Sequence, residues 1–375
     1  MIIYLFLFHF KSFCVIMSLK ILIEVYFFMD KVLLGLSGGV DSAVCAALLL
    51  EAGFDVTGCF LMLTENSGEN SEEAENARTI ARHLGIKLIT ADYREHFRKN
   101  VTDYFINEYL SGKTPNPCIR CNPTTKIYSL QNEAEKLGIG LTATGHYALT
   151  EYDEKYNGIV LKSAPSKKDQ SYFLGRLSPS QIERLIFPLG KFSTKDEVRE
   201  YALQLSLPNA KKADSQEICF IPDNNYQKFI CENSSFVAKK GNFLDNDGKV
   251  IGTHTGIINY TVGQRKGLGA FGEPRYVKSI NAMNNTVTLC KADERFENSV
   301  TAQDISAAVK NFPESTFEAQ VKIRSTAKAE KATITVENGI LKAEFENRIL
   351  APTPGQSAVI YKDDVVLGSA IICNH

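Results

Sequence analysis

The octet Gly35-Leu36-Ser37-Gly38-Gly39-Val40-Asp41-Ser42 joins the apolar run Lys31–Leu36 to an Ala- and Leu-rich stretch, Ser42–Glu51. The apolar run is typical of a buried parallel strand, and the stretch after the octet is typical of a helix that stops at Gly53. Adjacent glycines let the backbone turn tightly, and a helix N-terminus offers unpaired N–H groups and a positive dipole end. The octet therefore predicts a phosphate site.

The side chains of the octet add to this prediction. Ser37 and Ser42 supply hydroxyl donors, and Asp41 can orient the loop or hold Mg²⁺ beside phosphates. The spacing is not that of a Walker A loop, because no Lys follows the second glycine, nor is it G-x-G-x-x-G. A plain Gly-rich turn with a Ser cap is the alternative. The position at the first strand-to-helix switch of an α/β sheet favours ligand binding.

Strand and helix patterns alternate up to about residue 150, which predicts a doubly wound parallel sheet covered on both faces. The expected strands are Lys31–Leu36, Asp55–Leu63, Lys87–Asp92 and Leu141–Thr144, and the expected helices are Ser42–Glu51, Glu72–Leu84, Glu95–Leu110 and Lys126–Leu137. We expect residues 150–238 to be loop-rich and mainly helical. Beyond Gly241 short β-prone segments, with a hairpin at Asn338-Gly339, predict a small β-rich domain and a C-terminal β-barrel. The expected domains are 29–238, 239–292 and 293–375.

Composition excludes several classes of protein. With 375 residues, 44% hydrophobic and 23% charged, the chain is neither disordered nor a heptad rod. A net charge of −1 leaves no global basic field, so a polyanion must be met by local patches. The first 28 residues are apolar but interrupted by Lys11, Lys20 and Glu24, in runs shorter than the roughly 20 residues that cross a bilayer. We interpret them as an upstream start or leader before Met29, with an amphipathic anchor as the alternative, and expect no membrane partner.

The nine cysteines are too sparse for a disulfide scaffold and favour a reducing compartment. Cys45 and Cys59 lie in apolar patterns typical of core residues, whereas Cys118 and Cys121 form a C-x-x-C pair in a Pro-stiffened loop. Cys219 follows far downstream, and only the fold could bring it close. Zinc would need a second close ligand pair, which the sequence lacks. A three-cysteine iron–sulfur site at Cys118, Cys121 and Cys219 stays an open alternative.

The octet resembles the pyrophosphate loop (PP-loop) of ATP-dependent adenylating enzymes, which are adenine nucleotide alpha hydrolase-like. SGGVDS, TPNP-x-x-x-C-N, ATGHYA, KDQSYFL, DSQEICFI, TVGQRKGLG and TPGQSAV occur in the order found in bacterial tRNA-specific 2-thiouridylases, from about Lys31 to the C-terminus. The resemblance implies ATP-dependent replacement of the C2 oxygen of the wobble uridine by sulfur in tRNAs for lysine, glutamate and glutamine. It also implies a cytoplasmic enzyme that receives sulfur from a cysteine desulfurase or a sulfur-relay protein.

The resemblance implies roles for particular residues. The octet, Leu61 and Gly145 would bind ATP with Mg²⁺. Cys219 would carry a persulfide and Cys121 would be the partner nucleophile, with a Cys121–Cys219 disulfide as the spent state. The tRNA would be bound by Asn116, Pro117, Cys118, His146, Lys168, Asp169, Gln170, Arg324, Ser325 and Gln356. Many members have Asp at the position of Cys118, so the catalytic acid or base stays unassigned, with His146 as the nearest candidate.

Two competing functions share parts of this pattern. A PP-loop amide-forming ligase acting on a small molecule would have the same loop but would need no paired cysteines. A non-enzymatic RNA-binding module would account for the β-rich tail and leave the phosphate loop unused. The set of three cysteines favours the sulfur transferase.

Overall fold

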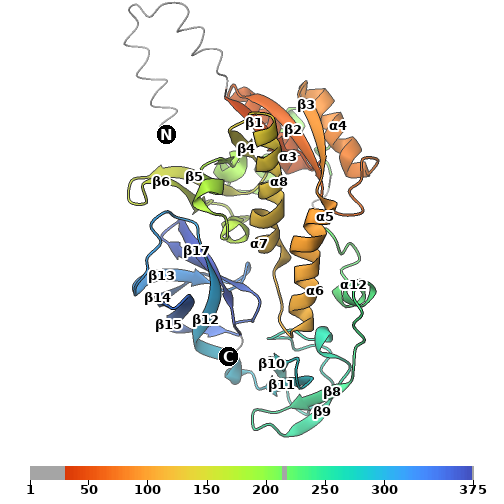
Figure 1. The fold of residues 1–375 in the computed structure, drawn as a ribbon, viewed down its shortest axis with the longest axis vertical. Helices are drawn as coiled ribbons and strands as arrows, with labels where there is room; N and C mark the ends of the chain where they lie inside the picture. The colour runs from red at the N-terminus through yellow and green to blue at the C-terminus, as the bar shows by residue number, and fades with distance from the viewer. Residues whose placement is uncertain (1–29, 213–217, 374–375) are drawn as a thin grey trace, which may run out of the picture. The chain divides into compact units, whose positions relative to one another are not determined.

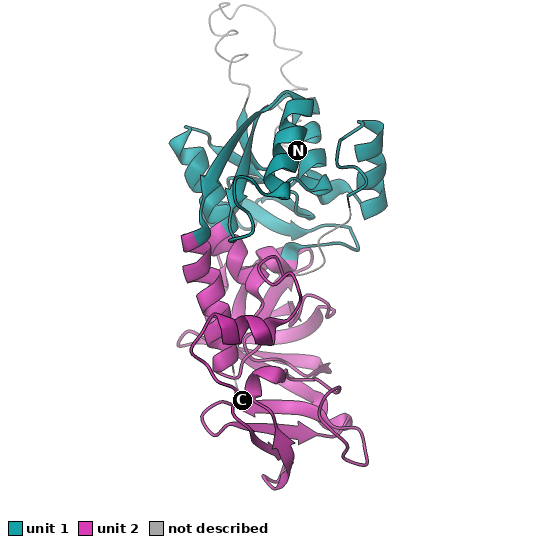
Figure 2. Ribbon diagram, turned by 90° about the vertical axis from the view of Figure 1, so that its right-hand side faces the viewer, with its two compact units in different colours: residues 1–94, 126–171, 178–214 teal, residues 95–125, 172–177, 215–375 magenta. Residues whose placement is uncertain are grey.

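The computed structural model describes residues 30–212 and 218–373, so the leader prediction for residues 1–28 lies outside the described residues. The chain forms two compact units (Figure 2). Unit 1 contains residues 30–94, 126–171 and 178–212, and unit 2 contains residues 95–125, 172–177 and 218–373. Within the described ranges, no helix has both the length and the apolarity to cross a membrane.

Unit 1 is built on a five-stranded parallel sheet with the order β3-β2-β1-β4-β7 (Figure 1). The strands are β1 (Lys31–Gly35), β2 (Asp55–Met62), β3 (Lys87–Asp92), β4 (Leu141–Ala143) and β7 (Leu185–Ile186). Each of the four strands predicted from hydrophobic runs is present, and the predicted doubly wound sheet is confirmed.

Helices cover both faces of this sheet. They are α3 (Val40–Glu51), α4 (Glu72–Leu84), α8 (Ile127–Lys136) and α11 (Lys195–Gln204). One core joins Val32 and Leu34 to residues of α3 and α4, and a second joins Leu33 to Leu130 and Ala134 of α8. The alternation of side chains along β1 thus sends neighbouring residues into different cores. Such double burial explains why the strand is a continuous apolar run.

The prediction that residues 150–238 are mainly helical was wrong at its start. An antiparallel hairpin, β5 (Ala148–Asp153) and β6 (Gly158–Ser163), lies there. Asn157 adopts a positive φ of 47° at its turn, next to Gly158. The turn residues were visible in the sequence, but the polar residues of β5 concealed this strand, of which only Ala148 is buried. Short helices follow: α9 (Ser171–Leu174), α10 (Pro179–Ile182), η4 (Pro188–Lys191) and α12 (Tyr226–Glu232).

Unit 2 begins with a nearly continuous helix that was predicted as Glu95–Leu110. It runs through α5 (Arg94–Phe97), the π-helical turn η2 (Arg98–Thr102) and α6 (Asp103–Leu110). After a loop come α7 (Pro117–Cys121) and the π-helical η3 (Asn122–Lys126).

The rest of unit 2 is β structure, as predicted. A four-stranded sheet has the order β10-β11-β8-β9, from β8 (Gly241–Leu244), β9 (Val250–His254), β10 (Tyr276–Asn281) and β11 (Thr286–Cys290). Strands β12 (Phe296–Ala307), β13 (Phe317–Lys322), β14 (Glu330–Glu337), β15 (Ile340–Leu350), β16 (Ser357–Lys362) and β17 (Val365–Ile372) form a barrel that the pairing of β12 with β17 closes. The predicted hairpin at Asn338-Gly339 joins β14 to β15.

We expect Gly190→Ala to destabilise unit 1, because a Cβ at Gly190 would overlap the carbonyl oxygen of Ala148. The loss in the free energy of unfolding should be about 1–3 kcal/mol, the usual cost of overpacking. Chemical denaturation measures it. Gly140→Ala is the matched control, since nothing lies within 4 Å of a Cβ there. Equal stability of the two variants would contradict the predicted close packing.

Candidate active site

The predicted phosphate loop connects β1 to α3. Gly39 is the N-cap residue of α3 and has an extended backbone, and no side chain caps this helix end. Ser42 Oγ donates to the carbonyl oxygen of Gly39 at 3.0 Å and accepts from the N–H of Ser37 at 3.3 Å. The two hydroxyls of Ser37 and Ser42 also lie 3.3 Å apart. The loop therefore folds on itself and leaves the helix amides available to an anion.

Asp41, in the first turn of α3, is held by two side chains that sequence reasoning missed. Tyr147 donates its phenol to Asp41 Oδ1 at 2.8 Å, and Lys195 Nζ lies 2.5 Å from the same oxygen. The side chain of Lys195 is only 9% exposed. Tyr147 follows His146 in the quoted ATGHYA motif and could have been found there. Lys195 lies 154 residues from Asp41, on α11, and no local pattern marks it.

Gly38 shows why this loop requires glycine. Its φ is +76°, and a Cβ would come within 2.5 Å of the carbonyl oxygen of Glu73 on α4. The carbonyl oxygen of Gly38 accepts from Asn209 Nδ2 at 3.1 Å, and Asn209 is itself buried. Asn209 is a third residue of the loop's surroundings that sequence reasoning missed. The loop is thus enclosed by α4 on one side and by the segment after α11 on the other.

Two further predicted nucleotide residues lie at the carboxyl edge of the sheet. Gly145 packs against the phosphate loop, because a Cβ there would come within 3.1 Å of Asp41 Cβ. Leu61 lies near the end of β2, whose register pairs Cys59 with Gly35. Since parallel strands end at the same edge of a sheet, Leu61 lies at the carboxyl edge together with the phosphate loop. Ligands of α/β folds bind at this edge.

His146 is placed next to this edge, and its side chain is held by a neighbouring residue. Its Nδ1 forms a hydrogen bond with Thr144 Oγ1 at 2.8 Å. Burial, and then the positive charge of Lys126, lower the pKa of His146 to about 3. The imidazole is therefore neutral at physiological pH, which does not favour the role of general acid considered from the sequence.

The predicted tRNA-binding run Lys168-Asp169-Gln170 divides into one exposed and two structural side chains. Lys168 is exposed. Asp169 accepts from the hydroxyl of Ser171 at 2.8 Å, and Gln170 Oε1 accepts from the N–H of Tyr147 at 3.0 Å. Gln170 therefore orders the same backbone that carries His146 and the Asp41-binding tyrosine.

The C-x-x-C pair lies on α7. The side chain of Asn116 caps this helix by accepting from the N–H groups of Cys118 and Ile119 at 3.1 and 3.3 Å, and Pro117 occupies its first position. Cys118 is exposed, whereas Cys121 is 7% exposed. Asn116 is thus first a structural residue, because it determines where the helix and its thiols begin.

Cys219 is exposed, and the next residue, Phe220, anchors this segment to unit 2. The Phe220 ring packs edge-on against Phe97 of α5 and Phe105 of α6, with ring centroids 5.5 and 5.4 Å away. Helix α7 packs against η2, which lies between α5 and α6. The two distant cysteine segments are therefore attached to one helix of unit 2 (Figure 1).

The other cysteines provide a contrast. Cys45 and Cys59 are buried in the core of unit 1, as predicted, and burial raises the pKa of Cys59 to about 12. Burial also raises the pKa of Cys45. Such thiols are poor nucleophiles because they stay protonated. Cys118 and Cys219 differ from these two cysteines because they are exposed. Cys121 is buried, but it lies on α7 and not in the core of unit 1.

Of the predicted tRNA residues in the barrel, two bind the protein's own backbone. The Arg324 guanidinium donates to the carbonyl oxygen of Ala351 and to Thr353 Oγ1, and burial lowers its pKa. Gln356 Nε2 donates to the carbonyl oxygen of Thr114 at 2.7 Å. Ser325 is half-buried beside Arg324. The geometry gives Arg324 and Gln356 a structural task.

The arrangement of possible metal ligands does not support the iron–sulfur alternative. Within residues 30–212 and 218–373, no three His, Cys, Asp or Glu side chains gather closely enough to hold a metal ion. Cys118, Cys121 and Cys219 all belong to these residues. The three thiols in this arrangement do not fit a cluster, which needs its ligands converging on one point.

Three family models cover nearly all of the described chain. Residues 30–223 match the tRNA methyl transferase HUP domain, residues 227–291 the tRNA methyl transferase PRC-barrel domain, and residues 297–372 the aminomethyltransferase beta-barrel domain. The order of the matches agrees with the parallel sheet, the four-stranded sheet and the closed barrel.

Curated relatives align along most of their length. The tRNA-specific 2-thiouridylase MnmA of Clostridium perfringens is 42% identical over 354 residues, or 91% of this chain and 98% of the relative. MnmA 1 of Thermoanaerobacter pseudethanolicus is 44% identical over 356 residues, or 92% and 98%. MnmA of Acetivibrio thermocellus is 43% identical over 355 residues, or 91% and 99%. With this identity and coverage, the chain belongs to the tRNA-specific 2-thiouridylase family.

Proposed function

We propose that this protein is a tRNA-uridine 2-sulfurtransferase that uses ATP to thiolate the wobble uridine of tRNAs for lysine, glutamate and glutamine. Family membership supports tRNA 2-thiolation. The structural observation that carries the proposal is that one chain contains both an open helix N-terminus, in unit 1, and two cysteine segments on one helix, in unit 2. The first suits a polyphosphate and the second suits sulfur transfer.

Activation comes first in this proposal. The C2 carbonyl of uridine is amide-like, and its oxygen is a poor leaving group. Attack of that oxygen on the α-phosphate of ATP releases pyrophosphate and makes the oxygen part of a departing AMP. The α3 amides and the hydroxyls of Ser37 and Ser42 would bind the pyrophosphate.

Sulfur transfer follows in two balanced steps. The terminal sulfur of a Cys219 persulfide attacks C2 and AMP leaves, so that Cys219 is joined to the base through a disulfide bond. The Cys121 thiolate then attacks the Cys219 sulfur, and the bond pair of the broken S–S bond stays on the 2-thiouridine. The product is a Cys121–Cys219 disulfide, which an external thiol reductant must reduce before a cysteine desulfurase or relay protein reloads Cys219.

The tRNA contacts of the proposal begin at α7. The target base must leave the anticodon stack, and Asn116, Pro117 and Cys118 would border it. Cys118 is the exposed member of this group. Lys168 is exposed and suited to a phosphate, whereas Asp169 and Gln170 would act mainly by ordering their loop. We place the enzyme in the cytoplasm, where its tRNA substrates are.

Mg²⁺ fits the phosphate loop. Nucleotide sites usually hold it with one or two carboxylates plus substrate phosphates, and Asp41 is the carboxylate in the loop. When bound, Mg²⁺ would neutralise phosphate charge. In the structure Asp41 is neutralised by Lys195 instead, so the two cations would compete for the same carboxylate.

The alternative, a PP-loop amide-forming ligase, is not favoured. Such an enzyme would use the loop in unit 1 and leave Cys121 and Cys219 without a task. ATP cleavage that proceeds without tRNA and forms an amide from small molecules would support the ligase.

We expect Cys219→Ser to abolish thiolation and to leave ATP binding unchanged, because serine cannot carry a persulfide. Thiolated nucleosides are measured by mass spectrometry in an assay fed with a persulfide donor. Cys231→Ser, which changes another exposed cysteine on α12, is the control and should remain active. Full thiolation by the Cys219 variant would defeat the assignment.

We expect Asp41→Ala and Asp41→Asn to lose tRNA adenylation, measured as tRNA-dependent AMP formation. The fall should be on the order of a hundredfold, as when one electrostatic element of a site is removed. Asn keeps an acceptor for Tyr147 and preserves the side-chain shape. Normal AMP formation by both variants would contradict a role for the carboxylate.

We expect protein purified without oxygen to contain far less than one iron or sulfide per chain and to thiolate tRNA in that state. Elemental analysis and sulfide assay measure this directly. Cys118→Asp, which introduces the residue that many members of the family have at this position, should retain activity. Stoichiometric iron that is lost in Cys118→Asp would instead establish a cluster.

A further inference from the structure

The barrel contacts the loop that precedes the C-x-x-C helix through one short turn, Thr353–Gln356. The N–H of Thr114 donates to the carbonyl oxygen of Pro354 at 2.9 Å. The amide Nε2 of Gln356 donates to the carbonyl oxygen of Thr114 at 2.7 Å. Both backbone polar groups of Thr114 are therefore bound by residues of this turn.

The turn is itself braced. Arg324 binds its beginning, through the carbonyl oxygen of Ala351 and the hydroxyl of Thr353. Its end is joined to β17, because the N–H of Ile372 donates to the carbonyl oxygen of Gln356 at 2.9 Å. Gly355 has a φ of +89°, and a Cβ there would lie 3.1 Å from the backbone of Thr114. The turn and the loop are thus in direct contact, with no room for a larger residue.

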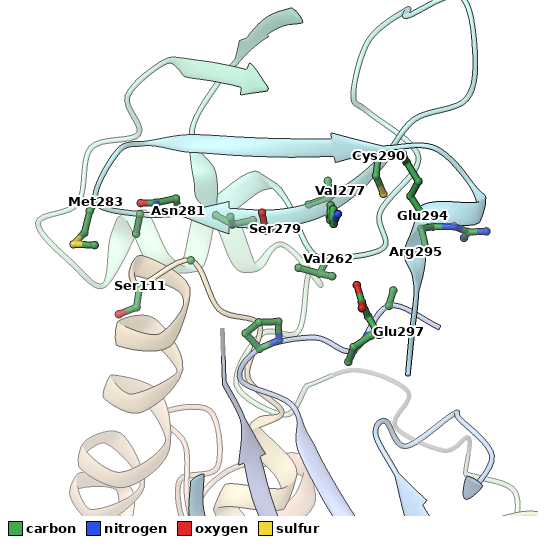
Figure 3. Close-up of a pocket in the computed structure, with 17 residues that line it drawn as sticks. Ser111, Val262, Val277, Ser279, Asn281, Met283, Cys290, Glu294, Arg295 and Glu297 are labelled. Atoms are coloured by element: carbon green, nitrogen blue, oxygen red, sulfur yellow. The ribbon is translucent and has the colours of Figure 1, made fainter. Parts of the chain in front are cut away.

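The turn packs closely against Thr114 at Gly355, but it borders open space at Pro352 and Pro354. A cavity of about 630 Å³ lies next to it, lined by Ala351, Pro352 and Pro354 of the turn segment, by Ser111 and Gly112 after α6, and by β10 (Figure 3). Where space is open, packing does not fix the position of a backbone, and hydrogen bonds must do so. The two bonds to Thr114 therefore restrain the loop at this point, in addition to the bonds between Lys113 and Glu108.

The restrained residue, Thr114, precedes α7, the helix that carries Cys118 and Cys121. Asn116, two residues after Thr114, caps α7, and Cys121 ends that helix with 7% of its surface exposed. We propose that Gln356 is a positioning residue that holds Thr114, and through it α7, so that the Cys121 thiol is kept buried and in place for attack on Cys219. This role is separate from the direct tRNA contact expected from the sequence, and the importance of Cys121 rests on the proposed function.

The first experiment needs neither tRNA nor ATP. Gln356→Ala removes the donor, and Gln356→Glu removes it while keeping the side-chain shape. Each variant is treated with iodoacetamide, and alkylation of individual cysteines is followed by mass spectrometry. We expect the rate at Cys121 to rise about tenfold, the population change that loss of one partly buried hydrogen bond allows.

Internal references make the result local. Cys231 is exposed and should react at the wild-type rate, and Cys59 is 1% exposed and should stay protected. Gln303→Ala is the matched control, since Gln303 is an exposed glutamine on β12 of the same barrel. An unchanged Cys121 rate in both Gln356 variants overturns the proposal. A parallel rise at Cys59 overturns it as well, because the turn would then serve only global stability.

Kinetics separate positioning from tRNA binding. In the Gln356 variants we expect kcat for thiolation to fall about tenfold with an unchanged KM for tRNA. A raised KM with an unchanged kcat would restore the tRNA contact and refute positioning. A wild-type protein that does not thiolate tRNA would refute the proposed function, whereas the alkylation result would still decide whether Gln356 restrains the loop.

Discussion

The charge balance at Asp41 is the constraint on which the phosphate site depends. A carboxylate in the first turn of α3 is favoured by the helix dipole but repels the phosphates that the same amides attract. Lys195, almost fully buried at 9% exposure, compensates that charge, and Tyr147 adds a hydrogen bond. A P-loop places its lysine within the loop itself. Here the cation comes from α11, so the site is complete only after the last helix of unit 1 has packed.

In unit 2, two cysteine segments that are distant in the sequence pack against one long helix. The long helix from α5 to α6 is the support, because α7 packs on its π-helical turn and Phe220 packs on Phe97 and Phe105. Cys121 is buried while Cys219 is exposed. An exposed thiol is accessible to large external molecules, and a buried thiol is shielded from solvent and oxidants.

Local patterns predicted the fold well where periodicity and glycine chemistry decide it. The strand of residues 31–36 and the Asn338-Gly339 hairpin needed only neighbouring residues. The β5–β6 hairpin was missed because β5 carries the polar residues Thr150, Glu151 and Asp153, and only Ala148 of this strand is buried. Lys195 and Asn209 were missed for another reason. Their partners, Asp41 and Gly38, are 154 and 171 residues away, and no single-sequence pattern encodes such pairs.

Arg324 and Gln356 show that a motif can be found in the sequence while the protein contacts of its side chains stay hidden. The sequence does not reveal whether a polar side chain is buried. Polar residues of a barrel that follows an RNA-modifying domain are therefore readily interpreted as RNA-binding residues. In the structure both side chains donate to backbone carbonyl oxygens, and an N–H group already engaged in a short protein hydrogen bond must break it before binding a ligand. A backbone acceptor left without its donor is costly only where water is excluded. The barrel therefore contacts the loop before α7 through the backbone of one residue, Thr114.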